Sequence, residues 1–260
     1  MQQIIDLSFW QLLSAYVFIL ILMVIVRLKG IQREKEILIA SVRMTVQLGL
    51  TGYLLGYIFD TPSPWMTLLI LLAMESFAIY TLFKRNKGKL TKKLKRTVAL
   101  SLICGTVTCL LFFLLVVVRI DPWYTPQYFI PIAGMLIGNS MTGISLGISR
   151  LVDGMHDQRD LVEGALMLGA TPQLAAKPVV NAAFDAAILP SLNSMLGMGI
   201  VFLPGMMTGQ ILSGTSPLTA ISYQIAIMLG IVGAVSLTVI LFLQLGYRCF
   251  FNEQSQLIVD

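Results

Sequence analysis

Several polar side chains that could bind an ion lie within long apolar runs of this sequence. Arg43 and Gln47 are four residues apart, so they share one face of a helix. Glu75 lies midway through the apolar run LLAMESFAIY. Carboxylate and amide oxygens suit hard metal ions, so Glu75 is a candidate metal ligand or charge relay. The alternative is structural: Arg43 and Glu75 neutralise each other as an ion pair.

The second half of the chain adds amides, a hydroxyl and thioethers in similar surroundings. Polar residues within membrane spans usually face a pathway or a partner helix, because they are costly in lipid. Thioethers suit softer metal ions, although methionine more commonly fills gaps in a core. Together with Arg43, Gln47 and Glu75, the residues that form the candidate substrate pathway are Asn139, Ser140, Asn193, Met195 and Met198.

Motifs for enzymatic chemistry are absent from the sequence. The phosphate-binding pattern G-x-x-x-x-G-K-[ST] does not occur, because GKL at 88–90 lacks both the first glycine and the hydroxyl residue. His156 is the single histidine, which excludes an H-E-x-x-H zinc site. We therefore expect a protein that is not an enzyme and has no cofactor of its own. Any ATP and Mg²⁺ must be bound by a partner.

The longest polar stretch, RLVDGMHDQRDLVEGALMLGATPQLAAKPVVN, carries signals for two helices. Asp157 and Asp160 favour a helix N-terminus, where negative charge is stabilised. Gly169 is typical of a residue that ends a helix in the left-handed conformation. Thr171 and Pro172 fit the N-cap and first position of a second helix. The pattern predicts a short helix, a tight glycine turn and another helix.

The first of these two helices has an apolar face, because Leu161, Ala165 and Leu168 recur at helical spacing. A lone amphipathic helix can lie on a membrane surface. Acidic residues disfavour that alternative, because they are repelled by an anionic leaflet; here they are Asp153, Asp157, Asp160 and Glu163. We therefore expect this helix to fill a groove in a partner protein.

The elements that position all these residues are membrane helices. The 260 residues are 57% hydrophobic and only 12% charged, whereas a soluble domain carries about 25% charged residues. A helix that crosses the hydrocarbon core needs about 20 apolar residues. Seven runs qualify and predict an all-α membrane protein with one domain over residues 1–260: 9–26, 37–59, 65–83, 98–118, 128–148, 186–203 and 218–245.

Basic residues are confined to alternate loops and predict the orientation. The loop 27–36 holds four basic residues and the loop 84–96 holds eight, whereas the loops near 60–64 and 204–217 hold none. Positive residues prefer the cytoplasmic side. We therefore expect the N-terminus outside, and the C-terminus and the loop at about 150–181 in the cytoplasm. The net charge of +5 then serves topology and contact with lipid headgroups, not nucleic-acid binding.

The spacing E-G-A-x-x-x-G from Glu163 to Gly169 resembles the EAA loop of ABC-transporter permease subunits. In that family the loop forms a coupling helix that inserts into a cleft of the ATP-binding subunit. The resemblance implies a coupling role for a set of residues in this loop: Asp160, Leu161, Glu163, Gly164, Ala165, Leu168, Gly169, Ala170 and Pro172. The chain departs from the importer branch at 181–182, where Asn-Ala stands in place of Leu-Pro.

The flanking stretches PIAGMLIGNSMTGISLGISRL and LNSMLGMGIVFLPGMMTGQILSG extend the resemblance over most of the chain. Together they are similar to the Fet-type metal-export permease family, which includes bacterial iron exporters and plant aluminium-tolerance half-transporters. The resemblance implies a permease subunit in the bacterial inner membrane. It would work as a homodimer with two separate ATPase subunits and export metal ions, iron first.

Two other classes of function remain open at this stage. One is an ATP-independent secondary carrier or channel, which would be favoured by inverted repeats with broken helices at matching positions; no such repeat is visible. The other is a membrane scaffold that only recruits a cytoplasmic partner through the 150–181 loop. A scaffold predicts no ATP-dependent flux and no role for Glu75.

Overall fold

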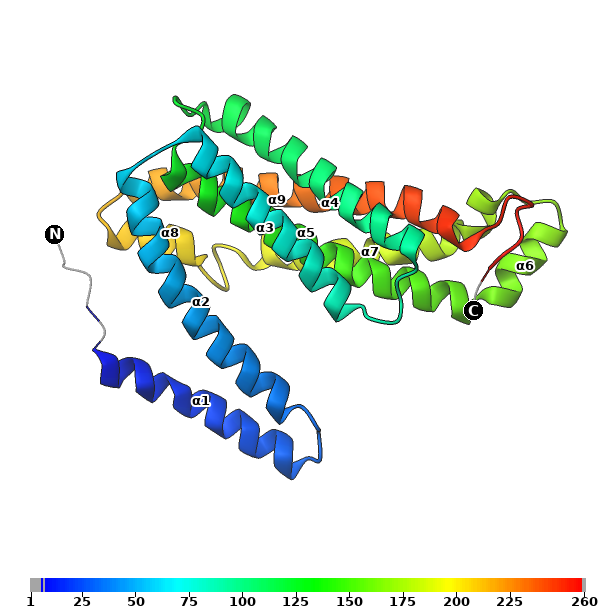
Figure 1. The fold of residues 1–260 in the computed structure, drawn as a ribbon, viewed down its shortest axis with the longest axis horizontal. Coiled ribbons are helices and arrows are strands. Elements are labelled where there is room, and N and C mark those ends of the chain that lie inside the picture. Colours follow the sequence, from blue (N-terminus) through cyan, green and yellow to red (C-terminus); the bar gives the residue numbers. More distant parts are fainter. Residues whose placement is uncertain (1–5, 7, 259–260) are drawn as a thin grey trace. The chain divides into compact units, whose positions relative to one another are not determined.

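The computed structural model describes residue 6 and residues 8–258, which are almost entirely helical (Figure 1). Among them, seven helices are long and apolar enough to cross a membrane, which confirms the predicted all-α membrane fold. The α-helices run as follows: α1 Phe9–Leu28, α2 Glu34–Asp60, α3 Pro64–Arg85, α4 Lys92–Phe112, α5 Pro126–Asp157, α6 Arg159–Met167, α7 Pro172–Gly197, α8 Gly205–Leu212 and α9 Pro217–Gly246. A π-helical turn, Phe113–Val118, extends α4, and a short 3₁₀ turn, Tyr247–Phe250, follows α9.

The chain divides into two compact units, which are described separately. One comprises residues 1–62 and 212–214, and the other residues 63–211 and 215–260. The prediction of one domain over residues 1–260 stays a prediction. Residues 1–5, 7, 259 and 260 of that range lie outside the described residues.

The first unit is built from α1 and α2. Ser8 and Gln11 form a capping box that satisfies the first backbone amides of α1. The hydroxyl groups of Tyr16 and Thr45 hydrogen-bond and join the two helices. Most side chains of α1 and α2 are exposed in this single chain, as expected for helices that face lipid on most sides.

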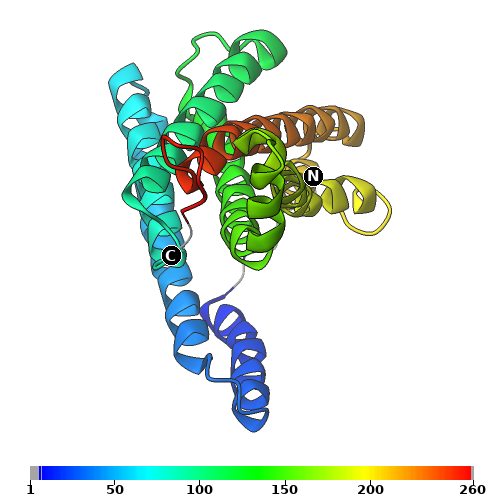
Figure 2. The same ribbon diagram turned by 90° about the vertical axis from the view of Figure 1, so that its right-hand side faces the viewer.

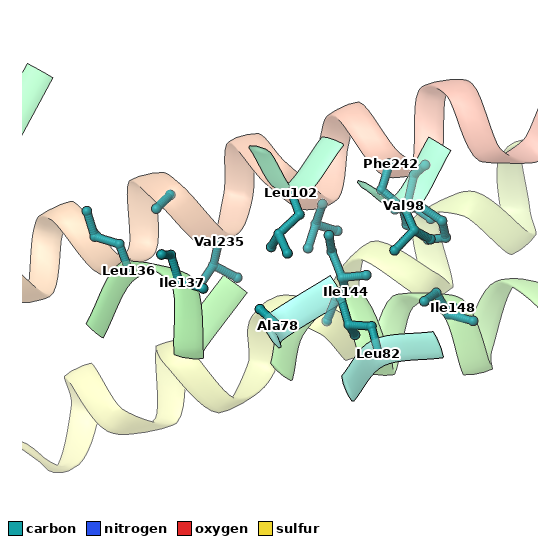
Figure 3. Packing of buried hydrophobic residues seen from close by; sticks show 14 of the residues in the cluster. Ala78, Leu82, Val98, Leu102, Leu136, Ile137, Ile144, Ile148, Val235 and Phe242 are labelled. Atoms are coloured by element: carbon teal, nitrogen blue, oxygen red, sulfur yellow. The ribbon is translucent and has the colours of Figure 1, made fainter. Parts of the chain in front are cut away.

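The second unit packs α3, α4, α7 and α9 around α5. The core is a cluster of buried hydrophobic residues, largely from these helices (Figure 3). Ile144 and Ile148 of α5 are fully buried and lie among residues of the neighbouring helices, including Leu82 of α3 (Figure 3). The helix α5 is therefore the element on which the rest of the unit is assembled.

The helices α4 and α9 approach unusually closely at Gly105. An added Cβ at this position would lie 2.8 Å from the Cα of Thr238 and 2.3 Å from its Oγ1. Thr238 is itself fully buried, and its hydroxyl donates a hydrogen bond to the Ala234 carbonyl at 2.6 Å. Only a residue without a side chain allows the two backbones to come this near.

The predicted sixth span, 186–203, is wrong at both ends. The helix α7 begins at Pro172 and ends at Gly197, so the second helix of the polar loop and the sixth span are one continuous element. Residues 198–203 leave the helix, because Gly199 has a positive φ of 84° and its amide bonds the Phe202 carbonyl at 3.0 Å. The short helix α8 then follows, where no helix was expected.

Candidate functional site

The polar loop folds as a hairpin in which α6 ends at a tight glycine turn and α7 begins. Gly169 has a φ of 89°, in the left-handed region that favours glycine. Its amide bonds the Leu166 carbonyl at 3.0 Å, and the Ala170 amide bonds the Ala165 carbonyl at 3.0 Å. This pair of bonds is the Schellman arrangement that closes a helix. Thr171 then caps α7, accepting the Leu174 amide at 3.3 Å.

The helix α6 exposes large apolar side chains in its first turn and at and just beyond its C-terminal end. Leu161 is 73% exposed, Met167 85% and Leu168 91%, whereas Val162 is 2% exposed and attaches the helix to the unit. A cluster of this kind on a polar segment marks a surface made for a partner. The apolar patch is defined here as Leu161, Met167 and Leu168.

Two details of the predicted helix are corrected by the structure. Asp157 is the last residue of α5, and α6 begins at Arg159, so only Asp160 lies in the first turn. Ala165 is half-buried and not part of the exposed face. Met167 does not share the helical spacing of Leu161 and Leu168, so the sequence pattern does not single it out; it lies two residues before the helix-ending Gly169.

Charged pairs surround the hairpin. The guanidinium of Arg159 donates to the carboxylate of Glu163 at 2.8 Å, and this hydrogen bond raises the pKa of Arg159 above its ordinary value. Lys89, from the loop between α3 and α4, donates to both carboxylate oxygens of Asp153 at 2.6 and 2.8 Å. It also donates to the Ser149 hydroxyl at 3.1 Å.

The Lys89–Asp153 pair joins the basic loop at 84–96 to the last turns of α5. Both therefore lie at the same end of the second unit as α6, whereas α8 lies at the opposite end (Figure 1). Figure 2 views the chain from the α6 end. The positive-inside rule predicts that this shared end is cytoplasmic, and the cytoplasmic placement of α6 stays a prediction.

The predicted pathway residues lie in different environments. Glu75 is 4% exposed in α3 and contacts the Thr106 hydroxyl of α4. Ser140 in α5 is fully buried, and its hydroxyl has no hydrogen-bond partner. Arg43 and Gln47 lie in α2, in the other unit. The ion pair between Arg43 and Glu75 therefore stays a prediction.

The amides of the fifth and sixth spans are exposed at similar depth. Gly143 of α5 lies against Ala187 of α7, because an added Cβ would be 3.4 Å from the Ala187 carbonyl oxygen. Gly154 lies against Val179 in the same way, at 2.7 Å, so the two helices are antiparallel. Asn139 and Asn193 lie one to two turns from the first contact, in the same direction along the bundle.

The remaining pathway candidates and one further acid are on α7 and just beyond it. Met195 is 38% exposed, and Met198 packs partly against the core. Asp185 is also exposed within α7. It was missed because the predicted span began one residue later, at 186. Among the described residues no three His, Cys, Asp or Glu side chains gather into a metal site.

The fold and these surfaces define a multi-pass membrane protein with a structured polar hairpin at one end of its helix bundle. The model of the uncharacterised protein family UPF0014 matches residues 9–251. The chain belongs to this family.

Named relatives cover most of the chain. The "Probable iron export permease protein FetB" of Escherichia coli is 33% identical over 226 residues, covering 87% of this chain and 85% of the relative. "Protein ALUMINUM SENSITIVE 3" of Arabidopsis thaliana is 36% identical over 244 residues, 94% and 88% of the two chains. The "UPF0014 membrane protein slr1647" of Synechocystis is 37% identical over 231 residues, 89% of each. No solved structure matches the chain.

Proposed function

We propose that this chain is the membrane subunit of an ABC exporter and that α6 is its coupling helix. The observation that carries the proposal is the apolar patch of Leu161, Met167 and Leu168, exposed at the end of the bundle that also holds the basic loop. Side chains of this size gain free energy only when a partner covers them. A cleft in a cytoplasmic ATPase is such a partner, by the helix-in-groove mode.

The energy for transport comes from that partner. The chain has no phosphate-binding loop, so ATP and Mg²⁺ bind to the ATPase subunit. The helix α6 is held between the ends of α5 and α7, which are long and packed against each other. When ATP closes the ATPase pair, α6 moves, and α5 and α7 tilt with it as rigid rods. The bundle then alternates between two states that differ in the side to which a central path is open.

Two copies of the chain form the transporter, because polar side chains on α5 and α7 must be shielded from lipid. Asn139, Asn193 and Asp185 are exposed in one copy, on helices that cross the membrane. Exposing polar or charged side chains to lipid costs on the order of several kcal/mol. The faces of α5 and α7 that carry these residues therefore turn toward a second copy. A pair of ATPase subunits also needs two coupling helices. The central path then runs between the two α5–α7 faces, with lipids covering the apolar outer surface.

The substrate class is metal ions, with iron as the first candidate. The E. coli relative is named as a probable iron export permease, and plant relatives include a protein named for aluminium sensitivity. Carboxylate and amide oxygens suit such hard ions. The amides of Asn139 and Asn193 and the carboxylate of Asp185 are of this type and face the proposed path, and Met195 adds a thioether.

Co-purification tests the docking of α6. We expect the detergent-solubilised chain to retain its ATPase, and Leu168→Asp to weaken that binding by about 2 kcal/mol, or roughly thirtyfold. Ile31→Asp is the matched control, because Ile31 is an exposed apolar residue, 50% exposed, in the basic loop 27–36 outside α6. Equal retention of the ATPase by both variants would contradict the proposal.

A further inference from the structure

A carboxyl group is buried in the middle of the second unit. Glu75 of α3 is 4% exposed, and the helices packed against α3 are α4 and α5. One of its oxygens, Oε1, contacts the Thr106 hydroxyl. The other, Oε2, is buried without a hydrogen-bond partner. A carboxylate with one bare oxygen in an apolar interior is among the costliest groups a membrane protein can hold.

The Thr106 hydroxyl has one proton and cannot donate a full hydrogen bond to both of the oxygen atoms that it contacts. It lies 2.7 Å from the carbonyl oxygen of Leu102, one helical turn earlier, and also contacts Glu75. Both of these neighbours are acceptors if Glu75 is ionised, and a hydroxyl has a single proton to donate. If Thr106 donates to Leu102, as buried threonines in helices commonly do, the contact with Glu75 requires a proton on Glu75.

Within the described residues of the second unit, the helices packed on α3 and α4 hold no charged residue at the depth of Glu75. On α4 the basic residues end at Arg96, ten residues or about 15 Å along the axis from Thr106. On α3 the next charge is Lys84, nine residues on. On α5, Met74 lies against Gly134, and the nearest charges along that chain are Asp121 and Arg150, thirteen and sixteen residues away. The helix α9, which packs on α4, has no charged residue.

We propose that Glu75 and Thr106 form a proton-binding site inside the membrane bundle, in which Glu75 is a neutral acid that donates its proton to the Thr106 oxygen. The single proton of the neutral acid makes a hydrogen bond to the Thr106 oxygen. The other carboxyl oxygen, which has no partner, then carries no charge. Any cation that binds this carboxyl must first displace the proton. That last consequence rests on the proposed metal transport; the protonation itself does not.

Infrared spectroscopy of the chain in lipid, without any ATPase or metal, tests the proposal. At neutral pH the spectrum of the unsubstituted chain should contain the carbonyl stretch of a protonated carboxylic acid, and Glu75→Gln should remove it. Thr106→Val should move the band to higher frequency because the acid loses its hydrogen bond. Thr106→Ser keeps the hydroxyl and should leave the band in place.

Isotope labelling covers the case in which the variants fail to fold. Glutamate labelled with ¹³C at the side-chain carboxyl should move the band to lower frequency in the unsubstituted chain. A spectrum with no protonated-acid band overturns the proposal. In that case, a band that appears only in Arg43→Gln would establish the ion pair between Arg43 and Glu75. Because the measurement uses the chain alone, the protonation of Glu75 can be disproved while ATPase docking is confirmed. Equally, docking can be disproved while the protonation is confirmed.

Discussion

At the scale of single residues, the hairpin depends on backbone shape as much as on side-chain chemistry. Gly169 reverses the chain between α6 and α7 at a φ of 89°, with nothing within 4 Å of where a side chain would start. Its requirement is therefore conformational and not steric. Leu168, next to it, is the most exposed residue of the apolar patch at 91%. The turn thus fixes the direction in which that patch is presented.

Gly169→Ala should strain the hairpin without filling any space. An alanine in the left-handed region costs about 1–2 kcal/mol, so we expect ATPase binding to weaken by up to roughly thirtyfold and membrane insertion to be unchanged. Gly214→Ala is the matched control, because Gly214 also has a positive φ, 97°, with open space around it, and lies outside the hairpin. Titration of the ATPase against each variant in detergent measures the difference. Identical affinities for the two variants would contradict a coupling role for this turn.

The Lys89–Asp153 pair should make a small and specific contribution to stability. Its side chains are 38% and 47% exposed, so solvent screens it, and we expect a coupling of only about 0.5–1 kcal/mol. A double-mutant cycle of Lys89→Met and Asp153→Asn, followed by thermal unfolding in detergent, isolates this term. Strict additivity of the two substitutions would show that the pair does not hold the basic loop to α5.

At the scale of helices, close contacts between backbones fix the bundle. Gly105 lies against the Cα and the side chain of Thr238, so α4 and α9 approach closely at this point. The same face continues into the π-helical turn, where Phe113 packs against Gly230: an added Cβ there would lie 2.9 Å from the Phe113 ring. Such contacts supply the dispersion energy that holds helices together in lipid, where apolar burial alone gives little.

Gly105→Ala should destabilise the second unit. The new methyl group would overlap the Thr238 backbone, and overpacking of this kind costs about 1–3 kcal/mol. Gly233→Ala in α9 is the control, because nothing lies within 4 Å of its added Cβ; it should be neutral or slightly stabilising. Thermal unfolding of both variants, monitored by size-exclusion chromatography, shows which of the two is less stable. A Gly105→Ala variant as stable as Gly233→Ala would contradict the tight crossing.

The helices could be predicted from the sequence where apolar runs and breakers agree. The hairpin turn at Gly169 and the cap at Thr171 follow from local chemistry, and both are present. The sixth span could not be bounded, because α7 starts with a polar, proline-containing turn and ends before an apolar loop. Hydropathy therefore predicts a start for the sixth span that is too far along the chain, and Asp185 falls outside the predicted span. The burial of Glu75 against Thr106 depends on packing between helices, which no single-sequence pattern contains.

For the whole molecule, coupling through α6 requires one orientation in the membrane. The loop at 84–96 and α6 share one end of the second unit, and coupling to an ATPase requires that end to lie in the cytoplasm. Loops without basic residues, such as 60–64 and 204–217, must then face outward.

Cysteine accessibility in intact cells tests this orientation. In a background in which Cys104, Cys109 and Cys249 are replaced by alanine, Asp60→Cys should react with a membrane-impermeant maleimide. Lys87→Cys, at a position that is also exposed in this chain, should react only after the cells are permeabilised. The reverse pattern would place α6 outside, where no ATPase could reach it.

The most direct test of the central claim is ATP hydrolysis by the purified chain and its ATPase in proteoliposomes, with and without ferrous or ferric iron. We expect metal to stimulate hydrolysis, and we expect Gly169→Pro to abolish that stimulation, because it breaks the coupling turn while leaving the membrane helices intact. A complex that hydrolyses ATP with no response to metal would contradict the proposed substrate class. Failure of the chain to bind any ATPase would contradict the account of α6 altogether.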